Sequence, residues 1–240
     1  FDSHRGVDYD SANPPLYDSS TFHQQVLGGD TTYDYARSGN PNRNLLEEKL
    51  AKLEGADYAF AYASGIAAIS SVLLTLNSGD HVILPDDVYG GTFRLTEQIL
   101  TRFNIRFTTV DTTDVTAIED AIESQTKLIY LETPSNPLFK ITDIKAVAQL
   151  AQARDLLVAV DNTFMTPLGQ SPLTLGADIV VHSATKFLGG HSDIIAGVAI
   201  TNNKAVADAL YLLQNGTGNA LSAQDSWTLA KHLKLSLIHI

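Results

Sequence analysis

The sequence contains no cysteine among its 240 residues. Disulfides, thiolate catalysis and cysteine-bound metals are therefore excluded for this chain. Basic residues are also scarce, since 16 Lys and Arg stand against 27 Asp and Glu, for a formal net charge of −11. Proteins that bind nucleic acid or anionic membranes need a basic face, so we expect neither partner. No run of about 18 apolar residues is present, so we predict no membrane span and a cytoplasmic protein.

The remaining composition is that of a folded domain, with 44% hydrophobic and 18% charged residues. Residues 1–43 are rich in Asp, Ser, Thr, Tyr, Gly and Pro and show no sustained apolar period. We predict that they form an extended arm. Residues 44–234 are predicted to form one large domain.

Strand-like and helix-like segments alternate through this large domain. Leu46, Leu50 and Leu53 share one helical face before Gly55, which is a typical helix stop. Further helices are predicted at 65–76, 92–102, 116–122 and 144–154, the third opening with a Thr116–Glu119 capping box. Strands are predicted at 58–62, 81–84, 105–110, 128–132, 156–160, 179–181 and 196–200. The pattern predicts an α/β fold with a mostly parallel sheet flanked by helices.

Three predicted strands end in polar sequences. The segments that follow them are Thr133-Pro134-Ser135-Asn136-Pro137, Asp161-Asn162-Thr163-Phe164 and His182-Ser183-Ala184-Thr185-Lys186-Phe187. Ligands of parallel sheets bind beyond the carboxyl ends of the strands. We therefore expect a carboxylate, an amide, hydroxyls and an amine to meet at one edge of the sheet.

Lys186 and Asp161 suggest the chemistry of this edge. A lysine amine can form a Schiff base with a carbonyl compound. A carboxylate buried after an apolar strand needs a cationic partner, and a protonated pyridine nitrogen is one. Such a charge-assisted hydrogen bond contributes roughly 1.5–3 kcal/mol. It also keeps the ring cationic and therefore able to accept electrons. The competing interpretation of Asp161 is a simple helix N-cap.

A phosphate site is predicted where the strand 58–62 meets the next helix. Ser64, Gly65 and Ile66 lie at this junction, where the helix N-terminus presents free N–H groups and Gly65 permits close approach. The hydroxyls of Ser183 and Thr185 could add donors. An aldehyde, a pyridine and a phosphate combined in one molecule describe pyridoxal 5′-phosphate (PLP), which we predict as the cofactor.

Six motifs in the same order resemble those of one enzyme family. They are Tyr33-Asp34-Tyr35-Ala36-Arg37-Ser38-Gly39-Asn40-Pro41, Ala63-Ser64-Gly65, Asp87-Val88-Tyr89-Gly90-Gly91-Thr92, Glu132-Thr133-Pro134-Ser135-Asn136-Pro137, Val160-Asp161-Asn162-Thr163-Phe164, and Ser183-Ala184-Thr185-Lys186-Phe187 followed by Gly189-Gly190-His191. The chain resembles the Cys/Met-metabolism PLP enzymes, namely cystathionine β-lyases, γ-lyases and γ-synthases. Their fold is aspartate-aminotransferase-like, the fold type I of PLP enzymes.

The resemblance implies a role for each matching residue. Lys186 would hold PLP and move the substrate Cα proton, Asp161 would face the pyridine nitrogen, and Tyr89 would stack on the ring. Asn136 would lie near the phenolic oxygen of the cofactor and the substrate carboxylate. Tyr35 and Arg37 would reach the phosphate of a neighbouring subunit, so the arm implies a homo-oligomer, a dimer of dimers. The phosphate of the chain's own cofactor would be held by Ser64, Gly65, Ile66, Ser183 and Thr185.

The activity implied is that of a carbon–sulfur lyase in methionine and cysteine metabolism. Our leading hypothesis is cystathionine β-lyase, which forms homocysteine, pyruvate and ammonia, and γ-elimination or γ-replacement is the alternative. Gly91 stands where methionine γ-lyases typically carry a cysteine, which disfavours that activity. Family members continue into a C-terminal domain, which supplies the arginine for the substrate carboxylate and is missing from this chain. Residues 235–240 depart from the family pattern, so we expect an atypical, truncated end.

Several alternatives remain open from the sequence. A truncated homologue could bind PLP or a partner subunit without turnover. A nicotinamide-dependent oxidoreductase fits the sheet but lacks a G-x-G-x-x-G motif after the first strand. Tyr89 could be an ordinary core residue, and Arg37 and Arg43 could be surface charges. We expect structural roles for His182 and His191 and no metal site.

Overall fold

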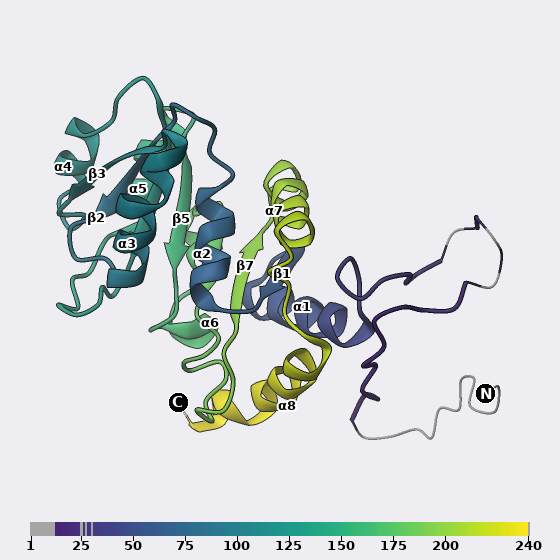
Figure 1. Ribbon diagram of the computed structural model, residues 1–240. Helices are drawn as coiled ribbons and strands as arrows, with labels where there is room; N and C mark the ends of the chain where they lie inside the picture. Colours follow the sequence, from purple (N-terminus) through teal and green to yellow (C-terminus); the bar gives the residue numbers. More distant parts are fainter. Residues whose placement is uncertain (1–12, 25, 27, 30, 240) are drawn as a thin grey trace.

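A seven-stranded sheet forms the centre of the computed structural model, which describes residues 13–239 except 25, 27 and 30 (Figure 1). The strand order is β1-β7-β6-β5-β4-β2-β3. β7 is antiparallel to both of its neighbours, β1 and β6, and the other strand pairs are parallel. The strands are β1 (Tyr58–Tyr62), β2 (His81–Pro85), β3 (Arg106–Val110), β4 (Thr126–Glu132), β5 (Leu157–Asp161), β6 (Ile179–His182) and β7 (Gly197–Thr201). The predicted mostly parallel α/β sheet is confirmed.

Helices cover both faces of this sheet (Figure 1). The α-helices are α1 (Pro41–Glu54), α2 (Gly65–Leu73), α3 (Gly90–Gln98), α4 (Val115–Asp120), α5 (Ile144–Gln152), α6 (Thr166–Gly169), α7 (Lys204–Thr217) and α8 (Ala223–His239). Apolar side chains of α2, α3 and α7 form one core with the sheet. Those of α1 and α8, and of α4 and α5, form two further cores. Alternate residues of β6 show the two faces, since Ile179 and Val181 lie in the first core and Val180 lies in the second.

The ends of α1 follow from local chemistry. The Asn40 side chain accepts hydrogen bonds from the backbone N–H groups of Asn42 and Arg43, and Pro41 occupies the first turn, where its missing N–H is not needed. Gly55 ends the helix with φ 68°, a left-handed conformation that favours glycine. The helix predicted before Gly55 is therefore confirmed. The interpretation of Arg43 as a surface charge is wrong, because its side chain is only 3% exposed.

Several predicted helix boundaries differ from the structure by a few residues. The predicted Thr116–Glu119 capping box is wrong, because the Asp114 side chain caps α4 by accepting from Thr116 N–H at 2.9 Å. The helix predicted at 92–102 divides into α3 and a 3-10 turn at Leu100–Phe103, with Ile99 between them. The helices α7 and α8 have no counterpart in the sequence prediction.

The predicted arm falls partly outside the described residues, because positions 1–12 are not described. Its described part has no helix before α1, and a single bridge pairs Thr21 with Tyr35. It extends away from the layers beside α1 and α8 (Figure 1). The helix α1 begins at Pro41, inside the segment assigned to the arm.

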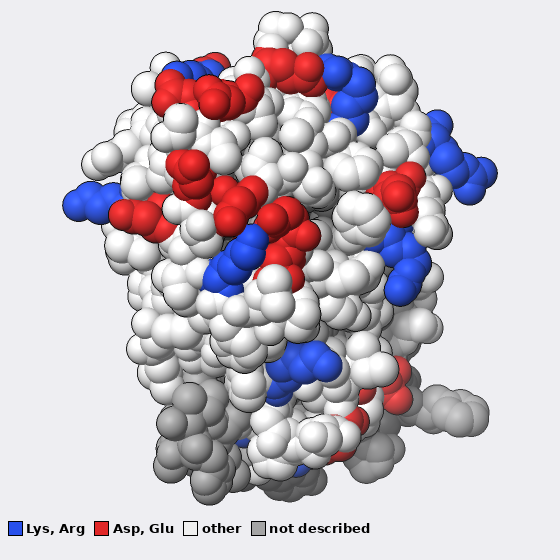
Figure 2. Space-filling model, turned by 90° about the vertical axis from the view of Figure 1, so that its left-hand side faces the viewer, with Lys and Arg blue, Asp and Glu red and all other residues white. Residues whose placement is uncertain are grey.

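Acidic and basic side chains are interleaved on the side of the molecule that carries β3 and α4 (Figure 2). Ion pairs join Arg106 to Glu123, and Lys140 to both Asp86 and Asp111. This face therefore shows no single-signed field of the kind that attracts polyanions. Within the described residues, no helix combines the length and the apolarity that crossing a bilayer requires.

The strand register decides where the polar strand ends lie. Glu132 of β4 is paired with Asp161 of β5, and Asp161 is paired with Val181 of β6. Three parallel strands therefore end at nearly the same level. Their polar extensions open onto one edge of the sheet, where parallel sheets bind ligands.

Candidate active site

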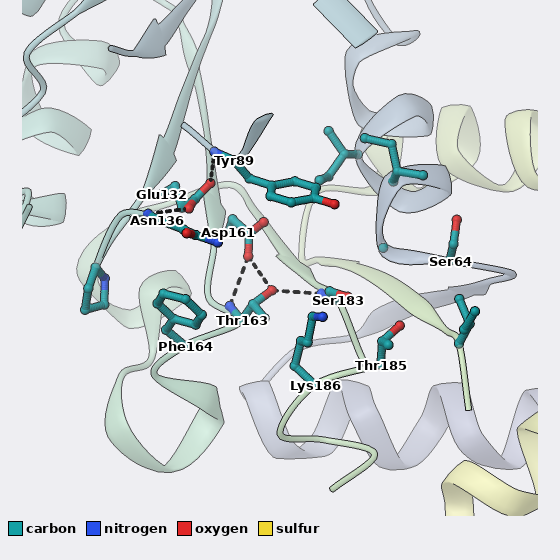
Figure 3. A pocket seen from close by; sticks show the side chains of 15 residues that line it. Ser64, Tyr89, Glu132, Asn136, Asp161, Thr163, Phe164, Ser183, Thr185 and Lys186 are labelled. Atoms are coloured by element: carbon teal, nitrogen blue, oxygen red, sulfur yellow. Dashed lines mark hydrogen bonds between the residues drawn. The ribbon is translucent and has the colours of Figure 1, made fainter. Parts of the chain in front are cut away.

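A cavity of about 300 Å³ lies at this edge of the sheet (Figure 3). Every site residue predicted in the large domain lines this cavity, and the side chains of Lys186 and Asp161 both point into it. Tyr35 and Arg37 do not line it. The lining residues are Ser64, Gly65, Ile66, Ile69, Tyr89, Glu132, Pro134, Asn136, Asp161, Thr163, Phe164, Ser183, Thr185, Lys186 and Ile195.

Asp161 is a buried carboxylate at the end of β5. Its Oδ1 accepts from Thr163 N–H at 3.0 Å and from the Thr163 hydroxyl at 2.5 Å, and its Oδ2 accepts from the Tyr130 hydroxyl at 3.2 Å. Burial raises the pKa of the Asp161 carboxyl, while the Thr163 hydrogen bonds lower it. These donors are neutral, so the carboxylate is suited to a cationic partner in the cavity. The helix-cap alternative is wrong, because the next helix, α6, begins only at Thr166.

Thr163 connects Asp161 to the loop that carries the lysine. Its Oγ1 accepts from Ser183 N–H at 2.8 Å while donating to Asp161. Lys186 follows Ser183 by three residues, and its amine points toward Thr163 and Ser183 (Figure 3). The hydroxyl of Thr185 both donates to Ala196 O and accepts from Ala196 N–H, at 3.2 and 3.1 Å. Thr185 would have to release Ala196 O before it could donate to a ligand.

The N-terminus of α2 forms one wall of the cavity. Ser64 caps this helix by accepting from Ala67 N–H, which leaves the hydroxyl proton of Ser64 available to a ligand. Gly65 permits the loop after β6 to approach, since a Cβ at this position would lie 2.7 Å from Ser183 Cβ. The backbone of α2 and the side chain of Ser183 therefore converge on one point. The residues at this point could hold the phosphate that the sequence predicts here.

Tyr89 is half-exposed, with 49% of its surface accessible, so it is not an ordinary core residue. It precedes α3, and its ring lies over Gly91 and beside the cavity (Figure 3). A Cβ at position 91 would lie 2.4 Å from Tyr89 Cε1. Any side chain at position 91 would therefore displace the ring from its present place.

Glu132 is a lining residue that our sequence prediction did not include. Its Oε2 accepts from Tyr89 N–H at 2.9 Å and its Oε1 accepts from Asn136 N–H at 2.8 Å. One carboxylate thus fixes the backbone at two predicted site residues. Burial and the neighbouring charge of Asp161 raise the pKa of Glu132 to about 8. Its place as the last residue of a strand was the signal that could have identified it.

Two histidines have the structural environments expected from the sequence. His182 is buried, and its Nε2 lies 2.5 Å from Glu54 Oε1. His191 stacks on His232 with 3.8 Å between ring centroids. No group of three or more acidic or histidine side chains suited to a metal occurs within the described part of the chain.

A family model described as Cys/Met metabolism PLP-dependent enzyme matches residues 2–237. The chain belongs to this family. The Cys/Met metabolism enzymes most similar to it include a Staphylococcus haemolyticus protein named cystathionine beta-lyase MetC, which is 82% identical over 98% of this chain. The chain spans 60% of that relative's length.

Solved structures of Cys/Met metabolism enzymes share the fold. A cystathionine gamma-lyase from Lactobacillus plantarum complexed with L-serine has a TM-score of 0.91 and 50% identity over 93% of this chain. The metB protein of Corynebacterium glutamicum has a TM-score of 0.93 and 42% identity over 96% of this chain. This chain covers 58% and 60% of those two structures.

The residues of the cavity fit the PLP on which this family depends. Lys186 would hold its aldehyde carbon, Asp161 its ring nitrogen, and the N-terminus of α2 with Ser183 its phosphate. The fit depends on two observations, the buried carboxylate with neutral donors and the close approach that Gly65 allows.

Replacement of Gly65 by alanine is expected to weaken binding of PLP roughly tenfold, equivalent to one hydrogen bond of about 1.4 kcal/mol. The added Cβ would push Ser183 away from α2. The affinity is measured by spectroscopic titration. Gly216→Ala is the matched control, because no heavy atom lies within 4 Å of its added Cβ. Equal affinities of the two variants would contradict the phosphate site at Gly65.

Replacement of Glu132 by glutamine is expected to change how the stability of the cofactor-free protein depends on pH. The folded-state pKa is raised from 4.5 to about 8, so the carboxyl stabilises the fold below about pH 4.5 and this contribution is lost as the pH rises to about 8. The wild type should therefore lose stability relative to Glu132→Gln over this range, by an amount on the order of a few kcal/mol. Denaturant unfolding at several pH values measures it. Parallel pH profiles would refute the shift, and the exposed replacement Glu119→Gln serves as control.

Proposed function

We propose that the full-length protein is a PLP-dependent carbon–sulfur lyase of sulfur amino-acid metabolism, acting on cystathionine by β-elimination. The observation that carries the proposal is the shared cavity of Lys186 and Asp161 beside the N-terminus of α2. The relative that is 82% identical and named cystathionine beta-lyase supports the choice of substrate and reaction. Homocysteine, pyruvate and ammonia would be the products.

In this proposal four residues of the cavity have assigned tasks, namely Lys186, Asp161, Tyr89 and Asn136. The Lys186 amine would hold the cofactor until the amino group of the substrate displaces it. The freed amine would then take the proton from Cα, and the sulfur would leave from the β carbon as a thiolate that takes up a proton to become a thiol. PLP supplies an electron sink for the charge left at Cα. The Asp161 carboxylate keeps the ring nitrogen cationic. Tyr89 packs against the ring, and Asn136 orients the phenolic oxygen and the substrate carboxylate.

The proposal extends to the assembly. Tyr35 and Arg37 are exposed and lie outside the cavity of their own chain. We assign them to the cofactor phosphate of a neighbouring subunit, in a homo-oligomer built as a dimer of dimers. A cytoplasmic location belongs to the same proposal.

γ-Elimination is the second candidate, because the Lactobacillus plantarum protein of the same fold is named cystathionine gamma-lyase and is 50% identical. It would use the same lysine and carboxylate with one further proton transfer. The product distinguishes the two reactions, since β-elimination of cystathionine yields pyruvate and γ-elimination yields 2-oxobutyrate.

The full-length protein supplied with cystathionine is expected to release pyruvate, identified by chromatography of the keto acids. Lys186→Ala should abolish the release, because the amine that carries the proton is gone. Lys127→Ala removes an exposed lysine from β4 and should have no effect. Release of 2-oxobutyrate would indicate the γ-lyase instead. If cystathionine, cysteine and O-acylhomoserines all gave no turnover, a non-catalytic homologue would be indicated.

Asp161→Asn is expected to retain PLP weakly and to lower turnover by roughly 10²-fold, as the loss of an electrostatic stabiliser does elsewhere. The amide keeps the shape of the carboxyl but removes the charge that holds the ring nitrogen protonated. Spectroscopic titration measures the retained cofactor, and keto-acid release measures the turnover. Asp120→Asn, at an exposed position in α4, is the control. Full activity of the Asp161 variant would eliminate the role given to this residue.

A further inference from the structure

Arg43 is a buried cation that lies outside the cavity. Its side chain is 3% exposed, although arginine is rarely buried without partners. Its Nη1 donates to Ala36 O and its Nη2 donates to Arg37 O, both at 2.9 Å. A longer contact of 3.4 Å joins Nη1 to Leu221 O. The guanidinium, at the start of α1, therefore donates hydrogen bonds to two consecutive carbonyl groups of the arm.

Glu47, one turn further along α1, helps to hold this cation. Its Oε1 lies 3.9 Å from Arg43 Nε. The same oxygen accepts from Ala61 N–H at 2.8 Å and from Gln214 Nε2 at 3.0 Å. Arg43 and Glu47, which we call the arm clasp, thus connect the arm to β1 and α7. Burial lowers the pKa of Arg43, and the Glu47 charge opposes this shift.

The arm clasp fixes the backbone next to Tyr35 and at Arg37, whose side chains are exposed. Ala36 and Arg37, whose carbonyls it holds, lie directly after Tyr35. Arg37 Nη1 donates to Asn215 O at 2.6 Å and to Asn215 Oδ1 at 3.2 Å, and its guanidinium carbon lies 5.3 Å from the centre of the Tyr35 ring. Asn215 is neutral, so it leaves the positive charge of Arg37 unpaired. A phosphate would bind this guanidinium more strongly than Asn215 does.

We propose that Arg43 is a positioning residue that aims Tyr35 and Arg37 at the cofactor phosphate of a neighbouring copy of this chain. The inference rests on the proposed function, which assigns Tyr35 and Arg37 to the neighbouring site. Two carbonyls accept from two separate nitrogens of Arg43, and a planar guanidinium presents such donors in a fixed fork. A lysine at this position has one ammonium group and cannot reproduce that fork.

The first test measures the affinity of the full-length protein for PLP. Arg43→Gln is expected to weaken it about tenfold, Arg43→Lys to recover only part of the loss, and Arg37→Ala to match Arg43→Gln. Lys52→Gln removes an exposed cation from the same helix and should leave the affinity unchanged. Unchanged affinity in both Arg43 variants overturns the inference. If Arg43→Gln does not fold, the affinity of Arg43→Lys alone decides the outcome of this first test.

The second test asks whether Arg43 acts across the subunit interface, which a merely structural role in its own chain would not do. Arg43→Lys subunits are co-expressed in equal amounts with Lys186→Ala subunits, and PLP at limiting concentration is trapped on lysine by borohydride. In a mixed dimer, the intact Lys186 receives the intact arm of its partner. About a quarter of all sites should then bind with wild-type affinity, because random pairing makes half of the dimers mixed and each contains one complete site.

The same experiment with Arg37→Ala in place of Arg43→Lys separates the two possible failures. Recovery with both variants supports the inference. Recovery with Arg37→Ala but not with Arg43→Lys shows that Arg43 acts only within its own chain, and this result overturns the inference alone. No recovery with either variant shows that the arm does not act on the neighbouring subunit. This result would refute both the inference and the assignment of Tyr35 and Arg37 to the neighbouring site.

Discussion

The matched ends of β4, β5 and β6 are the constraint on which the cavity depends. Hydrogen-bonded pairing of Glu132 with Asp161, and of Asp161 with Val181, sets three strand ends at nearly the same level. A shift of one residue in either pairing would turn the terminal side chains to the other face of the sheet. One cavity could then no longer be lined by the Asp161 carboxylate, the loop that carries Lys186 and the Glu132 carboxylate together.

A buried polar network below the cavity holds these strand ends together. Glu54, the last residue of α1, accepts from Asn162 Nδ2 at 3.1 Å and contacts His182 Nε2. Gln170 Nε2 donates to Asn162 Oδ1 and to Thr133 O. The network therefore touches the residues that directly follow β4 and β5 and the last residue of β6. These hydrogen bonds form only when the three ends lie close together, so they favour the present arrangement of the ends.

The buried carboxyl groups of Glu132 and Asp161, at neighbouring strand ends, favour the binding of a cation in the cavity. The charge of Asp161 contributes to raising the pKa of Glu132, so the two groups resist being ionised together. Glu132 is held by two backbone N–H donors, whereas Asp161 is held by side chains and one backbone N–H. A protonated ring nitrogen at Asp161 would relieve this repulsion. The electrostatics of the cavity thus agree with the chemistry of the family to which the chain belongs.

The sequence alone determined the mostly parallel sheet, the edge of the sheet at which the cavity lies and the nine expected site residues of the large domain that line it. The sheet, its edge and most of these residues follow from local patterns, namely strand periodicity and the residues at the strand ends, whereas Tyr89 was expected only from the family resemblance. Only the tertiary structure decided that Arg43 is buried and that Glu132 holds Tyr89, because these contacts join positions far apart, 178 residues in the case of Arg43 and Leu221. No local pattern contains that information, since it depends on where the chain folds back against α1 and α7.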